Sequence, residues 1–354
     1  MLAPGKILKA EKWWDDKAPP LLGLAYYLLA TGTNVVPLGR SLIAMLAFIT
    51  AFIGVAGYGH VVNDLGDLEL DGAAGKPNTM QGRKPLPIAL MTVALLAVAW
   101  LPWLVLPANP WNLSFIGLQL LLLTVYAAPP LRLKARPLSG VLTDALYAFT
   151  VPLLITWTTW SRLGGPSKPQ PLLLAALIPW SLLAGIKGIL VHQDVDAESD
   201  AAAGIGTFVT RYGHARTLWL LSRIVIPAEF AFFILMTFAF SRELRFYPIA
   251  VALCFGWRIF QLTCLWDIPV DLPWKLSSEQ AVTIYGFRFL RDFYPDWFPV
   301  IMLVPLCFRN PAYLAIAGVH FAFFKTGLGH LIRNDLKAIP WGISKMKKGI
   351  RVQG

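Results

Sequence analysis

The chain of 354 residues is poor in charge, because only 14% of its residues are Asp, Glu, Lys or Arg. Soluble globular domains carry about a quarter charged residues, so this scarcity excludes an ordinary soluble domain. Hydrophobic residues make up 56% of the chain instead, and the mean hydropathy is +0.58. Apolar runs long enough to cross about 30 Å of hydrocarbon recur along most of the sequence. We therefore expect an all-α, polytopic membrane protein.

Cysteine is also scarce. The three cysteines, Cys254, Cys264 and Cys307, all lie in or beside apolar segments. Their spacing matches neither a metal-ligand motif nor a disulfide framework, which excludes the classes of protein that depend on either. The N-terminal segment is too polar for a cleaved signal peptide, so we expect the first apolar segment to be retained.

The net charge of +11 is the one compositional feature that is typical of nucleic-acid binding. In a membrane protein, however, Lys and Arg normally mark cytoplasmic loops and contacts with anionic lipid. We therefore expect membrane lipid, and no nucleic acid, as a partner of this chain.

Nine apolar segments are predicted to span the membrane as a helical bundle. They cover residues 20–36, 41–62, 88–106, 111–128, 138–160, 171–191, 217–240, 246–266 and 297–325. Arg309, Asn310 and Pro311 interrupt the last segment, which is therefore either one kinked helix or a hairpin that gives ten spans. We expect residues 1–329 to form a single transmembrane domain and residues 330–354 to form a basic C-terminal tail.

The distribution of Lys and Arg predicts the orientation. Loops 63–87, 129–137 and 192–216, together with the N-terminal segment, carry more Lys and Arg than the loops on the other side. The positive-inside rule therefore places these loops in the cytoplasm. The basic tail would lie outside with nine spans and inside with ten. The segment 267–295 contains a helical pattern, which is expected to lie on the membrane surface, to cover the cytoplasmic mouth or to form a packed connector.

Two acidic clusters follow apolar segments on this same side. In "NDLGDLELD", Asp64, Asp67 and Asp71 are spaced i, i+3 and i+7, so a regular helix places them on one face within about 60°. In "HQDVDAESD", Asp196 and Asp200 are spaced i, i+4 and also share a face.

Stacked carboxylates repel one another, and the repulsion grows near the membrane because the dielectric constant falls. A divalent cation removes this cost, and all-oxygen ligands suit Mg²⁺ that keeps waters and substrate phosphate oxygens in its shell. The paired clusters therefore predict Mg²⁺ as the cofactor and a diphosphate as the ligand. The alternative is a pair of solvated acidic loops at helix ends.

Cations occur where a diphosphate would need them. The candidates are Arg83, Lys84, Arg132, Lys134, Arg136, Lys187 and Arg211. Arg binds phosphate oxygens with bidentate hydrogen bonds and Lys binds them as a point charge. The alternative is that these residues are ordinary positive-inside markers, which explains Lys187 least well because it lies within an apolar span.

These residues resemble a known family. "NDLGDLELD" is similar to the NDxxDxxxD motif of the UbiA superfamily of intramembrane prenyltransferases, and "DAESD" is similar to its DxxxD motif. The resemblance continues in "RKPLP", "YAAPPLRLK" and "DAAAGIGTFVTRYG", in the family's order, and covers roughly residues 15–240. The chain departs from the family's usual pattern at Leu68 and Lys84, where many members have Arg.

The resemblance implies a bundle of about nine transmembrane helices around a lipid-open central cavity, with two Mg²⁺ ions between the motifs. The implied metal and catalytic residues are Asp64, Asp67, Asp71, Asp196 and Asp200, with Lys134 as a further catalytic residue. The implied diphosphate ligands are Asn63, Lys134 and the basic residues near Lys84.

We therefore expect an Mg²⁺-dependent prenyltransferase that moves a prenyl group from an isoprenyl diphosphate to a small lipophilic, often aromatic acceptor. Asp144, a charged residue inside the fifth span, is a candidate for acceptor contact or proton removal, or else a buried hydrogen-bonding partner. One alternative is a membrane terpene cyclase that needs no acceptor. A head-group phosphotransferase is disfavoured because most of its motif is missing. An ion-coupled transporter is disfavoured because the carboxylates lie at helix ends.

Overall fold

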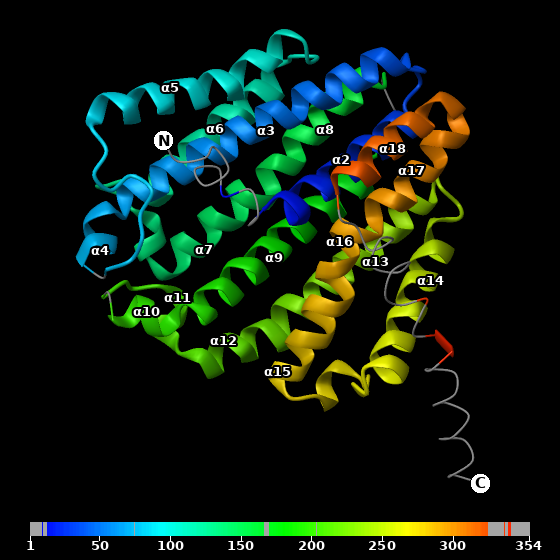
Figure 1. Ribbon diagram of the computed structural model, residues 1–354. Helices are drawn as coiled ribbons and strands as arrows, with labels where there is room; N and C mark the ends of the chain where they lie inside the picture. Colours follow the sequence, from blue (N-terminus) through cyan, green and yellow to red (C-terminus); the bar gives the residue numbers. More distant parts are fainter. Residues whose placement is uncertain are drawn as a thin grey trace.

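The computed structural model describes residues 9, 13–73, 75–165, 170–202, 204–324, 336 and 339–340. All regular secondary structure in these residues is helical, as the ribbon in Figure 1 shows. This confirms the all-α fold class. The predicted C-terminal tail, residues 330–354, lies outside the described residues apart from positions 336 and 339–340.

Seven helical segments are long and apolar enough to cross a membrane, and they coincide with the second to eighth predicted spans. The single helices are α3 (Leu38–Gly66), α6 (Pro110–Ala127) and α9 (Pro171–Val195). The composite ones are α5 with η2 (Pro85–Trp100, Leu101–Leu104), α7 with η4 and α8 (Pro137–Ala145, Leu146–Thr150, Val151–Leu163), α12 with η5 and α13 (His214–Leu220, Leu221–Val225, Ile226–Ser241), and α14 with η6 (Tyr247–Phe260, Gln261–Leu265). The chain is therefore a multi-pass integral membrane protein.

The first helix, α2 (Trp14–Thr31), begins earlier than the predicted segment 20–36. Most of its residues are buried, including Tyr26 and Tyr27, because it packs between α8 on one side and α17 (Phe298–Arg309) on the other. It is a core helix of the bundle, which is why its apolar residues surround the whole helix instead of forming one stripe.

The segment expected to lie on the membrane surface, to cover the cytoplasmic mouth or to form a packed connector is a packed helical run that leads into the last long helix. Helical residues run through α15 (Ser278–Ala281), η8 (Val282–Arg291) and α16 (Asp292–Asp296) almost directly into α17. Charged side chains in this run are paired with residues of other helices. Arg258 lies 3.3 Å from Asp292, and Arg291 lies 2.9 Å from Asp16.

The last predicted span is a hairpin, which was one of the two expected alternatives. Arg309, at the end of α17, donates hydrogen bonds to the carbonyls of Leu29 and Ala30 at the end of α2. After the break at Asn310, α18 (Leu314–Phe323) returns, and the Phe323 carbonyl accepts a hydrogen bond from Trp14 at the start of α2. The two helices therefore lie along α2 in opposite directions (Figure 1).

Close helix contacts hold the acidic segments in place. A Cβ atom on Gly66 would lie 2.3 Å from the Ala127 carbonyl oxygen, so the end of α3 touches the end of α6 directly. A Cβ atom on Gly185 would lie 2.7 Å from Ala145 Cα, so α9 packs equally closely on α7. The end of α3 and the middle of α9 are thereby both fixed to the adjacent helices α6 and α7.

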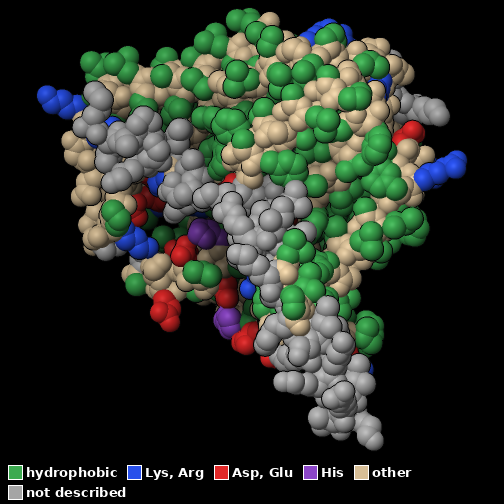
Figure 2. Space-filling view, turned by 45° about the vertical axis from the view of Figure 1, so that its right-hand side comes forward, with side chains coloured by type: hydrophobic (Ala, Val, Ile, Leu, Met, Phe, Trp, Pro, Cys, Tyr) green, Lys and Arg blue, Asp and Glu red, His purple; other side chains and the backbone are tan. Residues whose placement is uncertain are grey.

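The polar connections gather at one end of the bundle. Short helices α4 (Leu68–Ala73), α10 (Ala197–Ala202) and α11 (Phe208–Tyr212) lie together at the left-hand end of Figure 1. In Figure 2 acidic, basic and histidine side chains cluster on that side, whereas hydrophobic side chains cover much of the remaining visible surface. This separation is the one expected when the apolar part is embedded in lipid.

Lys187 joins α9 to α13 by a buried ion pair. Its Nζ atom lies 2.8 Å from Glu229 Oε1, and the two side chains are 7% and 0% exposed. Tyr294 donates a second hydrogen bond to Glu229 Oε1 at 3.0 Å. The sequence favoured Lys187 as a diphosphate ligand, but the structure brings its ammonium group to Glu229 because an unpaired cation inside an apolar bundle is costly.

Removal of one partner of this pair is expected to destabilise the protein strongly. Glu229→Ala leaves a buried ammonium group uncompensated and should lower the free energy of unfolding by about 3–5 kcal/mol. The double variant Lys187→Met/Glu229→Leu should recover most of that loss, since both charges are gone. Thermal unfolding in detergent measures both. A double variant as unstable as Glu229→Ala would contradict the pairing.

Candidate active site

A cavity of about 250 Å³ opens between the polar ends of α3 and α9. Its lining residues are Asn63, Asp67, Leu70, Asp71, Lys76, Tyr126, Lys134, Ile189, His192, Gln193, Asp196, Asp200, Ile205 and Thr207. Four carboxylates from the two predicted clusters therefore line one cavity, although more than a hundred residues separate the clusters in the sequence.

The first cluster is built at a break in the helix. α3 ends at Gly66, Asp67 is its C-terminal cap, and α4 starts at Leu68. The Asp67 amide still donates to the Asn63 carbonyl at 3.0 Å, and the Asp71 amide donates to the Asp67 carbonyl at 2.8 Å. The helical i, i+4 hydrogen bonds therefore continue across the break, and Asn63, Asp67 and Asp71 all line the cavity.

Asp64 does not line the cavity with the other acids of its cluster. Its side chain is buried, and its carboxylate lies 2.7 Å from Lys9 Nζ and accepts a hydrogen bond from Thr79. The shared face expected from a regular helix therefore places Asp67 and Asp71 together, with Asp64 packed beside them against the loop that follows α4.

The second cluster repeats the same local design. α9 ends at Val195, Asp196 is its cap, and the Asp200 amide donates to the Asp196 carbonyl at 2.9 Å. The sequences are parallel, since "DLELDGAAG" starts at Asp67 and "DAESDAAAG" starts at Asp196. The final glycine of each is left-handed, with φ of +64° and +67°. Two copies of one motif thus form opposite walls of the cavity.

Two cations from the segment after α6 hold Asp67. Lys134 Nζ lies 2.6 Å from Asp67 Oδ2 and donates to Asn63 Oδ1 at 2.9 Å, and Arg132 lies 2.7 Å from Asp67 Oδ1. Arg132 adopts a left-handed backbone conformation with φ of +36°, which is unfavourable for a residue with a Cβ atom. Such strain is commonly retained at functional sites, where it orients a side chain.

Two polar residues that were not predicted as site residues contact the two acidic segments. Asn78 donates hydrogen bonds to the Asp71 side chain and to the Asp64 carbonyl, both at 2.8 Å. Lys76 reaches across to Ser199 at 3.2 Å and so connects the loop after α4 with α10. The repeated motif could have indicated Asn78 as a site residue. Asn78 stands three residues after the left-handed Gly75, and Thr207 stands three residues after the left-handed Gly204.

The electrostatics of the cavity favour a bound cation. Burial, and after it the charge of Asp196, raise the pKa of the Asp200 carboxyl above its usual value. No three His, Cys, Asp or Glu side chains within the described ranges converge into a complete metal site. This arrangement fits Mg²⁺, which takes one or two carboxylates and completes its octahedron with water and phosphate oxygens. Asp67, Asp71, Asp196 and Asp200 could supply those carboxylates.

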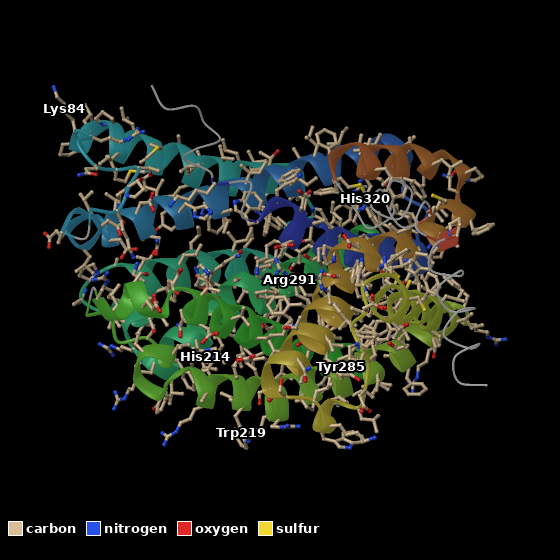
Figure 3. All side chains as sticks on the ribbon, turned by 60° about the horizontal axis from the view of Figure 1, so that its bottom comes forward. Lys84, His214, Trp219, Tyr285, Arg291 and His320 are labelled. Atoms are coloured by element: carbon tan, nitrogen blue, oxygen red, sulfur yellow. The ribbon has the colours of Figure 1, made fainter. Side chains whose placement is uncertain are left out.

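Other predicted ligands lie outside this lining. Lys84 is exposed and projects from the edge of the molecule in Figure 3. Arg83 donates to the Thr79 carbonyl at 2.8 Å, and Arg211 is exposed on α11. Arg136 is exposed as well. Within the described residues, the cavity lining contains none of these four.

Asp144 lies on α7, near the cavity but not in its lining. Its carboxylate accepts a hydrogen bond from the Tyr147 hydroxyl. Tyr147 stacks edge-to-face on Tyr126, which does line the cavity, with ring centroids 5.2 Å apart.

Curated relatives were found for most of the chain. It is 28% identical to a lycopene elongase/hydratase from Halobacterium salinarum over 265 residues, which is 72% of this chain and 86% of the relative. It is 27% identical to a probable homogentisate phytyltransferase 2 from Oryza sativa subsp. japonica, over 83% of this chain and 78% of that one.

Solved structures share the fold. A UbiA homologue from Archaeoglobus fulgidus, bound to GPP and Mg²⁺, is similar with a TM-score of 0.52 and 17% identity, over 84% of this chain and 98% of that chain. A structure described for digeranylgeranylglyceryl phosphate synthase gives a TM-score of 0.53 and 18% identity, over 85% and 96%. The model of the UbiA prenyltransferase family matches residues 19–284. The chain therefore belongs to the UbiA prenyltransferase family.

Proposed function

We propose that this chain is an Mg²⁺-dependent intramembrane prenyltransferase, which transfers a prenyl group from an isoprenyl diphosphate to a lipophilic acceptor and releases diphosphate. The observation that carries the proposal is the single cavity with Asp67 and Asp71 on one wall and Asp196 and Asp200 on the other. Opposed carboxylates with Lys76 and Lys134 in the same lining suit a ligand that brings both metal ions and phosphate oxygens.

The four carboxylates are the proposed holders of Mg²⁺, with Asp64 beside them. When bound, Mg²⁺ supplies positive charge that neutralises the departing diphosphate. Lys134 and Arg132 are proposed to bind diphosphate oxygens, because both contact Asp67. The diphosphate would bind the same metal ion as the Asp67 carboxylate. Asn63 is proposed to orient Lys134 through its 2.9 Å hydrogen bond.

The apolar side chains of the cavity lining suit the prenyl end of the donor. Ile189, Leu70 and the ring of Tyr126 are among them, so water is displaced from the apolar chain and from the allylic cation. An aromatic face also stabilises a carbocation next to it. The acceptor is proposed to enter from the membrane. The relatives are named for lycopene and homogentisate, so the acceptor class extends from a polyene to a phenol. Asp144 is the proposed acceptor-side residue.

Neutralisation of one aspartate on either wall of the cavity is expected to abolish diphosphate release. Asp67→Asn and Asp196→Asn should each lower Mg²⁺-dependent diphosphate release from geranyl diphosphate by on the order of 100-fold or more, because charge stabilisation at the leaving group is lost. Phosphate analysis after pyrophosphatase treatment measures this release.

The repeated motif supplies matched controls for this experiment. Glu69 and Glu198 occupy the same position in the two copies, two residues after Asp67 and Asp196, and both are exposed. Glu69→Gln and Glu198→Gln should therefore retain activity. Full activity of Asp67→Asn and Asp196→Asn would contradict the proposed site.

A terpene cyclase of the same family remains the alternative function. It would convert geranyl diphosphate and Mg²⁺ into a cyclic hydrocarbon or terpene alcohol without a second substrate. We expect prenylated product to form only when an acceptor such as homogentisate or lycopene is added, because the relatives are named for acceptor substrates. Gas chromatography of the donor-only reaction tests this. A cyclic terpene as the main product would favour the cyclase.

A further inference from the structure

Gln193, on α9, is a buried, uncharged polar residue in the wall of the active-site cavity. Its side chain is 5% exposed and lines the cavity together with Asp196. Its Oε1 atom accepts a hydrogen bond from the Phe208 amide at 3.1 Å. A backbone N–H group can donate only to the oxygen of a side-chain amide, so Phe208 determines which way the Gln193 amide points.

The repeated motif supports this orientation. Gln193 and Asp64 occupy the same position, three residues before the aspartate that caps each helix. In both copies the side chain at this position accepts a hydrogen bond from the residue fifteen positions later. Thr79 is that donor in the first copy. The Phe208 amide is that donor in the second. The hydrogen bond is therefore a feature of the motif itself, and the two copies differ in the other end of the side chain. The second oxygen of Asp64 contacts Lys9, whereas Gln193 has an NH₂ group there.

The Nε2 atom of Gln193 is left for a ligand in the cavity. Among the residues that the structure describes, no group accepts a hydrogen bond from it. A side-chain amide binds a cation through its oxygen, so an amide that turns Oε1 to Phe208 is not a ligand of Mg²⁺. It presents N–H donors instead, and a buried donor without an acceptor is costly. The matching ligand group is a hydrogen-bond acceptor, and phosphate oxygens are the acceptors that an isoprenyl diphosphate brings.

The position of Gln193 along α9 indicates which phosphate oxygen it meets. Ile189, Gln193 and Asp196 are spaced i, i+4 and i+7, and all three line the cavity. At a rise of about 1.5 Å per residue, Gln193 lies about 6 Å from Ile189 and about 4.5 Å from Asp196 along the helix axis. A donor whose diphosphate shares a metal ion with Asp196, and whose prenyl chain contacts Ile189, places its C1–O bond between them, at the level of Gln193.

We propose that Gln193 Nε2 donates a hydrogen bond to an α-phosphate oxygen of the isoprenyl diphosphate, next to the C1–O bond that breaks. The inference rests on the proposed function and adds an uncharged donor to it. When the C1–O bond breaks, its electron pair leaves with diphosphate, whose α-phosphate oxygens gain negative charge. The amide keeps both of its protons, and its hydrogen bond becomes stronger as this charge develops.

Three substitutions separate the two ends of the Gln193 amide. Gln193→Glu keeps an acceptor for the Phe208 amide and removes the donor, Gln193→Lys keeps a donor and removes the acceptor, and Gln193→Met removes both. The affinity of the full chain in detergent for inorganic diphosphate is measured by equilibrium dialysis with an excess of Mg²⁺. Gln193→Met and Gln193→Glu should bind about 10-fold more weakly, because a hydrogen bond to a charged group is lost. Gln193→Lys should bind at least as tightly as the unaltered chain.

The hydrogen bond should also contribute to the bond-breaking step. In Gln193→Met, kcat for Mg²⁺-dependent diphosphate release from geranyl diphosphate, with homogentisate as the acceptor, should fall by about 100-fold, because a donor to the developing charge is lost. KM should rise by less than kcat falls. Weaker diphosphate binding with an unchanged kcat would overturn the assignment of Gln193 to the oxygen beside the C1–O bond.

Gln119→Met is the matched control for diphosphate binding. Gln119, on α6, is also a buried amide, 4% exposed, but its Nε2 atom already donates to the Tyr147 carbonyl at 2.9 Å and it lies outside the cavity lining. This variant should bind diphosphate as the unaltered chain does. Gln193→Glu with unaltered affinity, or Gln193→Lys as weak as Gln193→Met, would show that only the bond to Phe208 matters and would overturn the proposal. Unaltered affinity in Gln193→Met would overturn it as well.

The outcomes also separate this inference from the proposed function. If the unaltered chain does not bind diphosphate with Mg²⁺, both are overturned. If it binds diphosphate but releases none from geranyl diphosphate, the proposed function is overturned, and the dialysis comparison still tests the contact with Gln193. If release by the unaltered chain is normal and Gln193→Met and Gln193→Glu bind diphosphate equally well, the inference alone is overturned.

Discussion

Uncompensated charge at the edge of a membrane is the constraint on which this structure depends. Four carboxylates line one small cavity at the end of an apolar bundle, where their mutual repulsion is poorly screened. Cations of the same chain compensate part of this charge. Lys134 and Arg132 form ion pairs with Asp67, and Lys9 forms one with Asp64. A site that is charged in this way is prepared for a ligand that carries metal ions and phosphate oxygens together.

The same constraint explains the deeper polar groups. Lys187 and Glu229 neutralise each other where α9 meets α13, and Arg258 and Asp292 do so where α14 meets α16. Asp144 differs, because the group that donates a hydrogen bond to its carboxylate is the neutral hydroxyl of Tyr147.

The sequence predicted much of the fold and the site. Apolar runs of membrane length indicated the second to eighth spans, and the i, i+4 spacing of Asp196 and Asp200 indicated a shared face. The position of Asp64 outside the cavity lining was not predictable, because its partners Lys9 and Thr79 lie 55 and 15 residues away in the sequence. The pairing of Lys187 with Glu229 was not predictable, because the two residues lie 42 positions apart in the sequence. The helical run that starts at Ser278 was obscured by charges that distant residues neutralise.

The central claim is that the two acidic walls bind one diphosphate through shared divalent ions. Anomalous diffraction from crystals grown with Mn²⁺ and geranyl thiolodiphosphate, a slowly reacting donor analogue, tests it most directly. The account predicts anomalous peaks at coordination distance from Asp67 or Asp71 and from Asp196 or Asp200, with the diphosphate between them. A diphosphate bound without metal, or metal on one wall only, would contradict it.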